Sequence, residues 1–184
     1  MKHIKTLEEH FKEIFDKVDE ALNNPLSVNW TFEAPYIYGS FKIEEKEYLI
    51  IAQFIINDFL TFKFKVKKNE DYSTELVNDG SKDFLRVVPT IRDSILYLLD
   101  TVKPNGIIFG AMDNSKGRKY VYDRFISEYI KIRKDYDAIS QLNGGIKLYT
   151  IYLQDLDVDI TATTVEFVVD NMKDLIPIEP QDNN

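Results

Sequence analysis

The chain contains no cysteine, which excludes disulfides, thiolate metal sites, iron–sulfur clusters and thiol nucleophiles. It has two histidines, His3 and His10, and neither has an acidic residue at a metal-ligand spacing such as His-Glu-x-x-His. We interpret both as packing or surface residues. With seven glycines in 184 residues, the chain has no Walker-type phosphate loop, no Gly-x-Ser-x-Gly elbow and no Gly-x-Gly-x-x-Gly motif.

Long apolar runs are also absent. The N-terminus turns acidic at Glu8 and Glu9, where a secretory signal would need its apolar core. The longest apolar stretch, residues 48–56, is interrupted by Gln53 and is too short to span a bilayer. We therefore expect a soluble intracellular protein without a membrane partner. The length fits one α+β domain over residues 1–175, followed by a polar tail over residues 176–184.

The net charge of −8 is unevenly distributed. Residues 155–184 contain eight acidic residues against one lysine, a net charge of −7, and the remainder of the chain is nearly neutral. Within that remainder, residues 116–134 contain seven basic residues against two acidic ones, a net charge of +5. Two explanations stay open. The patches neutralise each other in the fold or are solvated faces, or they dock between copies of the chain or onto another protein.

The first part of the chain predicts one helix followed by strands. Residues 6–22 have apolar side chains at three- and four-residue spacing, and Thr6 with Glu9 forms a capping box. After Pro25 the apolar period changes to two. The strands expected from this alternation are Ser27–Glu33, Tyr36–Ile43, Glu47–Ile56 and Phe59–Lys67. We expect an antiparallel meander in which the third strand is covered on both faces, and the fourth has one core face and one wet face.

The second part predicts alternating helices and strands. Residues 68–83 are polar, and we expect a mobile excursion there. Pro89 suits the first position of a helix that runs to about Thr101. The elements expected next are a strand over 106–112, a basic helix over about 116–134, a connector ending at Asn143-Gly144-Gly145 and a strand over 147–153. Residues 161–175 fit either a strand or a helix. The order predicts a mainly antiparallel twisted sheet with helices on both faces.

From Tyr36 onward this succession of elements resembles the GNAT family of N-acetyltransferases. The segment 114–125, which ends in Tyr122-Asp123-Arg124-Phe125, is similar to that family's strand-to-helix segment, with an asparagine followed by a tyrosine near a phenylalanine. The resemblance covers about half of the chain and implies a GNAT-like topology. The family's coenzyme A pyrophosphate loop has closely spaced glycines and should lie near residues 80–90, where Gly80 stands alone. We therefore expect a GNAT-like core that lacks the coenzyme A loop, and no cofactor.

The segments 103–109 and 117–125 also resemble small uncharacterised proteins encoded by tailed bacteriophages. That resemblance implies no activity. It implies a phage setting, and hence a location in the host cytoplasm, or in the virion if the protein is a structural component.

Three other chemistries are each set against a simpler interpretation or a conflicting feature. An acyltransferase would use Tyr122 as general acid and Glu47 or water as base, whereas helical spacing places Tyr122 in the apolar stripe of the basic helix. Residues 155–166 have the acidic spacing of an EF-hand, but Ile160 stands where that loop needs glycine. Nucleic acid binding would use the basic helix with Tyr120 or Tyr129 as a stacking residue, yet the acidic chain end repels phosphates.

We expect a non-enzymatic interaction or assembly protein of the phage type, which binds a protein partner or a second copy. It docks through the basic helix and the acidic C-terminal segment. The candidate binding residues are Ser115, Lys116, Arg118, Lys119, Arg124, Lys131, Arg133, Asp155, Asp157 and Asp159. No catalytic residue and no metal ligand is assigned. The alternative is a divergent GNAT-like acyltransferase that uses acetyl-coenzyme A.

Overall fold

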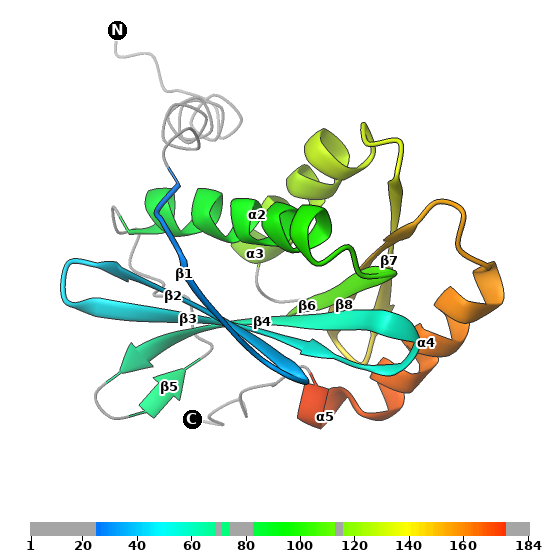
Figure 1. Cartoon of the computed structure of the whole chain (residues 1–184), viewed down its shortest axis with the longest axis horizontal. Helices are drawn as coiled ribbons and strands as arrows, with labels where there is room; N and C mark the ends of the chain where they lie inside the picture. Colours follow the sequence, from blue (N-terminus) through cyan, green and yellow to red (C-terminus); the bar gives the residue numbers. More distant parts are fainter. Residues whose placement is uncertain (1–24, 69–70, 74–82, 113–115, 176–184) are drawn as a thin grey trace, which may run out of the picture.

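The computed structural model describes residues 25–68, 71–73, 83–112 and 116–175. Within these ranges it forms a mixed α+β fold, in which one eight-stranded sheet carries helices on both faces (Figure 1). The fold class expected from the sequence is confirmed. The helix predicted over 6–22 and the tail predicted over 176–184 lie outside the described residues.

The first four strands form the predicted antiparallel meander. Their bounds are β1 (Asn29–Glu33), β2 (Tyr36–Ile43), β3 (Lys46–Phe54) and β4 (Phe59–Lys68). The expected turn between β3 and β4 is present as η1 (Ile56–Asp58), where Asn57 and Asp58 adopt φ angles of 56° and 54°. These are left-handed conformations, which Asn and Asp tolerate better than most residues, so the local sequence suits the turn.

A parallel pair joins this meander to the rest of the sheet. β6 (Gly106–Met112) pairs with β4 over Phe59↔Gly106, Leu60↔Ile107 and Thr61↔Ile108. Near the other end of β4, the short strand β5 (Asp71–Ser73) pairs antiparallel with it. The expectation of a mobile excursion over 68–83 was therefore wrong for residues 71–73, because the polar segment returns to hydrogen-bond with the edge of β4.

The crossover between the two parallel strands is α2 (Phe84–Thr101). It begins five residues before Pro89, so the prediction that this proline starts the helix was wrong. Pro89 lies within the first two turns of α2, where its missing N–H removes a single backbone bond. Val87 and Val88 are buried, which extends the apolar stripe toward the N-terminus and explains the earlier start.

The two faces of the sheet pack against different helices. On one face, the core includes Ile95 and Leu98 of α2 with Tyr122 and Phe125 of α3 (Lys116–Phe125). On the other face, Val165 and Val168 of α4 (Val158–Asp170) pack with strand residues such as Phe59 and Ile108. This second layer also buries Thr61, so the face of β4 expected to be wet is partly covered.

β7 (Tyr136–Asn143) and β8 (Ile146–Leu153) form an antiparallel hairpin at one edge of the sheet. β8 was expected, whereas the connector predicted before it was wrong for residues 136–143. The turn consists of Gly144 and Gly145, with φ angles of 54° and 80°. Two successive positive φ angles define the tight turn whose twist matches that of paired strands. The glycines therefore close a hairpin.

Residues 161–175 are helical. They belong to α4 and to the short helix α5 (Met172–Leu175), so packing of the apolar stripe prevails over the β-branched composition. Asp157 caps α4, because its Oδ1 accepts a hydrogen bond from the Asp159 N–H at 2.9 Å. Among the helices described, none is long and apolar enough to cross a membrane.

The parallel pair gives a first testable prediction. A β-carbon at Gly106 would collide with the Phe59 ring and with the Ile151 carbonyl oxygen, which is backbone and cannot swing away. We expect Gly106→Ala to lower the free energy of unfolding by about 3 kcal/mol, at the upper end of the usual cost of overpacking. The urea midpoint of the purified protein measures this change.

The matched control is Gly144→Asn. A β-carbon at Gly144 has no neighbour within 4 Å, and its φ angle of 54° is one that asparagine tolerates. The free energy of unfolding of the Gly144→Asn variant should stay within about 0.5 kcal/mol of the parent value. Equal stabilities of the two variants would contradict the tight packing assigned to Gly106.

Candidate functional site

The basic helix expected from the sequence is shorter than predicted and changes its winding. α3 ends at Phe125 and continues as η2 (Ile126–Ile130), a π-helical turn closed by the Lys131 N–H donating to the Ile126 carbonyl at 3.0 Å. The segment 131–134 is therefore a loop that leads into β7. Tyr122, Phe125 and Ile126 are buried, as the apolar-stripe interpretation predicted.

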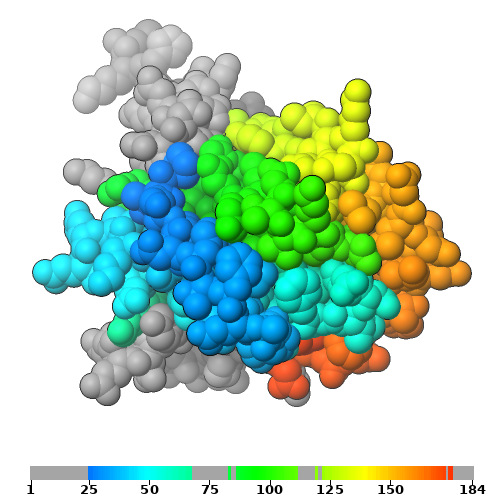
Figure 2. Space-filling model, viewed as in Figure 1, coloured from blue at the N-terminus to red at the C-terminus, as the bar shows by residue number. Residues whose placement is uncertain are grey.

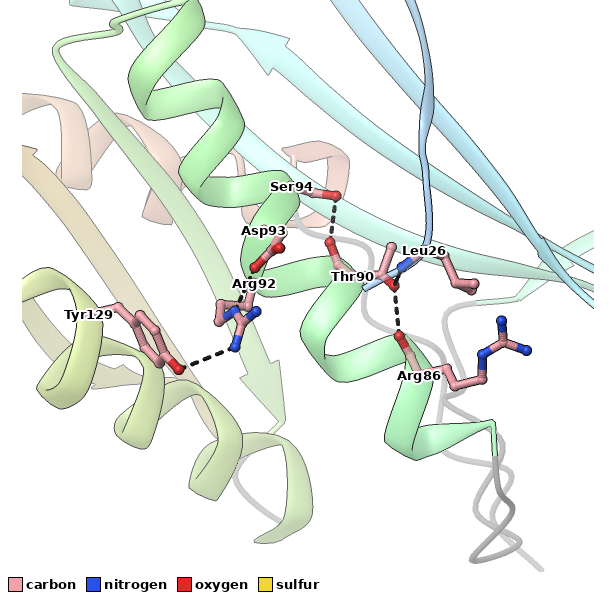
Figure 3. A network of polar contacts seen from close by, with 7 residues as sticks. All are labelled: Leu26, Arg86, Thr90, Arg92, Asp93, Ser94 and Tyr129. Carbon is pink, nitrogen blue, oxygen red and sulfur yellow. Dashed lines mark hydrogen bonds and ion pairs between the residues drawn. The ribbon is translucent and has the colours of Figure 1, made fainter. Parts of the chain in front are cut away.

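A polar network fixes η2 against α2 (Figure 3). Arg92 of α2 donates from Nη1 to the Tyr129 hydroxyl at 3.2 Å and from Nε to Asp93 at 2.6 Å. Its guanidinium also lies 5.1 Å from the centroid of the Tyr129 ring. Since Tyr129 belongs to η2, these contacts position the end of the helix from which the loop 131–134 departs.

The loop 131–134, called the basic loop below, contains two kinds of cation. Arg133 donates from Nη2 to Asp100 at 2.8 Å and to Asp135 at 2.6 Å, and its side chain is mostly buried. These hydrogen bonds, above all the one with Asp135, raise the pKa of Arg133 and lower the pKa of Asp135. Lys131 and Lys134 are exposed. Between them Ile132 is 74% exposed, which is unusual for an isoleucine.

The other predicted basic residues have varied positions. Arg124 donates to Glu128 at 2.7 Å within its own helix, and Lys119 is half-buried, with its carbonyl oxygen accepting from the Tyr149 hydroxyl at 3.3 Å. Ser115 lies outside the described residues, as do the side chains of Lys116 and Arg118.

The acidic candidates surround the start of α4. Asp155, Asp157 and Asp159 are all exposed, and Val158 between them is 77% exposed. We call residues 155–160, which include the first three residues of α4, the acidic loop. Asp157 acts as the helix cap, so a helix begins inside the segment that has EF-hand spacing. In the part of the chain that the structure describes, no group of three or more His, Cys, Asp or Glu side chains could hold a metal ion.

The hairpin brings the two loops to the same end of the sheet. Tyr136 at the start of β7 pairs with Leu153 at the end of β8, and the Gln154 N–H donates to the Asp135 carbonyl at 3.0 Å. The two segments are neighbours on the right of Figure 2. No ion pair between described residues connects them. Their adjacency could not be found from the sequence analysis, because it depends on β7.

The residues of the acyltransferase alternative lie apart. Tyr48 belongs to the core on the α2 and α3 face, so its neighbour Glu47 points to the opposite face, where it pairs with Lys67 at 3.3 Å. Tyr122 belongs to the core on the α3 face. The sheet therefore separates Glu47 from Tyr122.

The start of α2 is the place where the sequence resemblance puts a diphosphate. Asp83 stands there, with its carboxylate accepting from Lys46 Nζ at 2.7 Å and its carbonyl accepting from the N–H groups of Arg86 and Val87. The Asp83 side chain makes no hydrogen bond to the N–H groups of the helix, but a carboxylate near the positive end of a helix dipole offsets part of that charge and repels a second anion. The described residues at this end do not fit the coenzyme A diphosphate.

No family model matches the chain, and no curated protein matches it. Among solved structures, the chain is similar to a mutant of the spermidine N-acetyltransferase SpeG from Vibrio cholerae. The TM-score is 0.40 at 9% sequence identity, and the match covers 79% of this chain and 75% of that chain. A likeness of this size assigns neither an activity nor a substrate to this chain.

The basic loop gives the second prediction. Arg133→Gln should lower the free energy of unfolding at neutral pH by about 1–2 kcal/mol, because it removes hydrogen bonds to two carboxylates. Lys131→Gln should leave it unchanged, because this lysine is exposed. Urea unfolding of both variants distinguishes Arg133, whose charge stabilises the fold, from Lys131, whose charge is exposed. A loss of stability with Lys131→Gln would overturn the assignment.

The pH dependence of this effect follows from Asp135. Its ordinary pKa is 3.8 and its folded pKa is lower, so the contribution of the pair is complete above 3.8 and is lost as the pH falls through the lowered pKa. The stability difference between the parent and Arg133→Gln should therefore shrink on acidification. A difference that is equally large below the lowered pKa would contradict the role of the Asp135 carboxylate.

Proposed function

We propose that this chain is a non-enzymatic interaction or assembly protein that docks through the basic loop and the acidic loop. One observation carries the proposal: oppositely charged loops, each with a largely exposed aliphatic side chain, lie next to each other without an ion pair between their described residues. Exposed aliphatic groups with charged neighbours favour a protein partner, since burial of the former gives affinity and the latter give orientation.

Two points refine the expected surface. Arg133 and Arg124 form ion pairs with carboxylates of the same chain. Among the candidate side chains that the structure describes, the exposed cations are therefore Lys131 and Lys134. On the acidic side, Asp155 and Asp159 are exposed. The phage setting is part of the proposal and is supported by the sequence resemblance of residues 103–109 and 117–125.

The alternative, a divergent acyltransferase, is supported by the resemblance in the order of elements. Two features count against it: Asp83 at the start of α2, and the sheet that separates Glu47 from Tyr122. Isothermal titration with acetyl-coenzyme A distinguishes the two functions. Heat of binding at millimolar ligand, with turnover of an amine substrate, would favour the enzyme, whereas absence of heat favours the docking protein.

Docking gives the third prediction. We expect the parent protein to bind a protein, either itself or one retained from a phage-infected lysate, and to release it as salt rises from about 0.1 M. The double variant Lys131→Gln with Lys134→Gln should retain much less of the same protein, because the exposed cations are lost. Light scattering measures self-association, and quantified affinity capture measures binding of a protein from the lysate.

Lys42→Gln is the control, since Lys42 is exposed on β2, at a distance from both loops along the strand order. It should bind as the parent does. A monomer whose captured proteins are insensitive both to salt and to the double substitution would overturn the proposed function.

A further inference from the structure

We infer that the partner of this surface is a second copy of the same chain, bound about a two-fold axis that passes between the basic and acidic loops. This inference rests on the proposed function and specifies its partner. In the dimer, Lys131 and Lys134 of each copy face Asp155 and Asp159 of the other.

The argument begins with the arrangement of charge. A surface that has a positive half beside a negative half is complementary to itself, because a rotation of 180° places each half on its opposite. The backbone bond from the Gln154 N–H to the Asp135 carbonyl holds the two loops as neighbours. Figure 1 shows them leaving the same end of the β7 and β8 hairpin. Their spacing is therefore fixed by the sheet.

The apolar side chains follow the same symmetry. Ile132 is 74% exposed within the basic loop and Val158 is 77% exposed within the acidic loop. A two-fold contact places Ile132 of one copy against Val158 of the other, twice. Burial of aliphatic surface supplies affinity that salt does not screen, and the surrounding charges set the register.

The neighbouring position of the loops also selects the type of symmetry. Loops on opposite sides of a molecule would give a head-to-tail contact, which continues into a ring or a filament. When the two loops form one patch, a single partner copy occupies both of them. No binding surface is then left for a third copy, so association stops at the dimer. α3 and α4 themselves lie on opposite faces of the sheet, but their loops meet at its end.

The test is complementation by charge reversal, measured by sedimentation and light scattering. The basic-loop variant K131E/K134E and the acidic-loop variant D155K/D159K should each be monomeric, since like charges then face each other. An equimolar mixture should form a heterodimer, because both contacts become complementary again. Thermal unfolding of each variant confirms that it is folded, and recovery in the mixture excludes a folding defect as the cause of dissociation.

The outcomes separate this inference from the proposed function. A dimeric parent with recovery in the mixture supports the inference. A monomeric parent together with a monomeric mixture overturns it, while capture of another protein that depends on Lys131 and Lys134 leaves the proposed function in place. Assemblies that grow with concentration beyond a dimer overturn the two-fold arrangement.

The apolar contact has its own matched pair of variants. Val158→Ser should weaken the dimer about tenfold or more, since it acts twice in a symmetric contact. Leu142→Ser should leave the dimer unchanged, because Leu142 is 64% exposed at the opposite end of β7. Equal weakening by the two substitutions would overturn the assignment of the contact to the loop end of the hairpin.

Discussion

The parallel contact between β4 and β6 is the constraint on which the architecture depends. Three residue pairs join the β1–β4 meander to the antiparallel group of β6, β8 and β7. Glycine at position 106 permits the contact, because the Phe59 ring and the Ile151 carbonyl occupy the space of a β-carbon. Parallel neighbours require a long crossover, which α2 supplies. Because α2 and α3 fill one face, the other remains for α4.

The charged surface follows from a second local constraint, the two-glycine turn of the β7 and β8 hairpin. A turn of this length fixes the register of the two strands, so the residues before β7 and after β8 must emerge together. The basic and acidic loops are separated by the whole hairpin in the sequence and become neighbours in space. Backbone geometry at Gly144 and Gly145 thus determines which charges share a patch.

Sequence patterns predicted the meander, β6, β8, α2 and the basic helix, because each has a recognisable apolar pattern or turn residues. They left residues 161–175, which belong to α4 and α5, open between strand and helix. They missed β7, whose central residues Ser140 and Gln141 belong to an exposed edge strand without a continuous apolar face. The start of α2 was missed because Pro89 resembles a first-turn residue. The candidate charges were found, but their partners were not. The ion pair of Arg133 with Asp100 joins the basic loop to the end of α2, two segments that no local pattern connects.

The net charge of −8 makes two copies repel each other. This repulsion acts over a longer distance than the proposed attraction between the basic loop of one copy and the acidic loop of the other. At physiological salt the Debye length is about 8 Å, so charges spread over the molecule are largely screened between the centres of two copies. Charges that meet across a contact are separated by less than this length and keep most of their attraction. Salt does not screen the proposed contact between Ile132 and Val158. In the proposed dimer, the affinity therefore depends on the few residues of the local patch and not on the total charge of the protein.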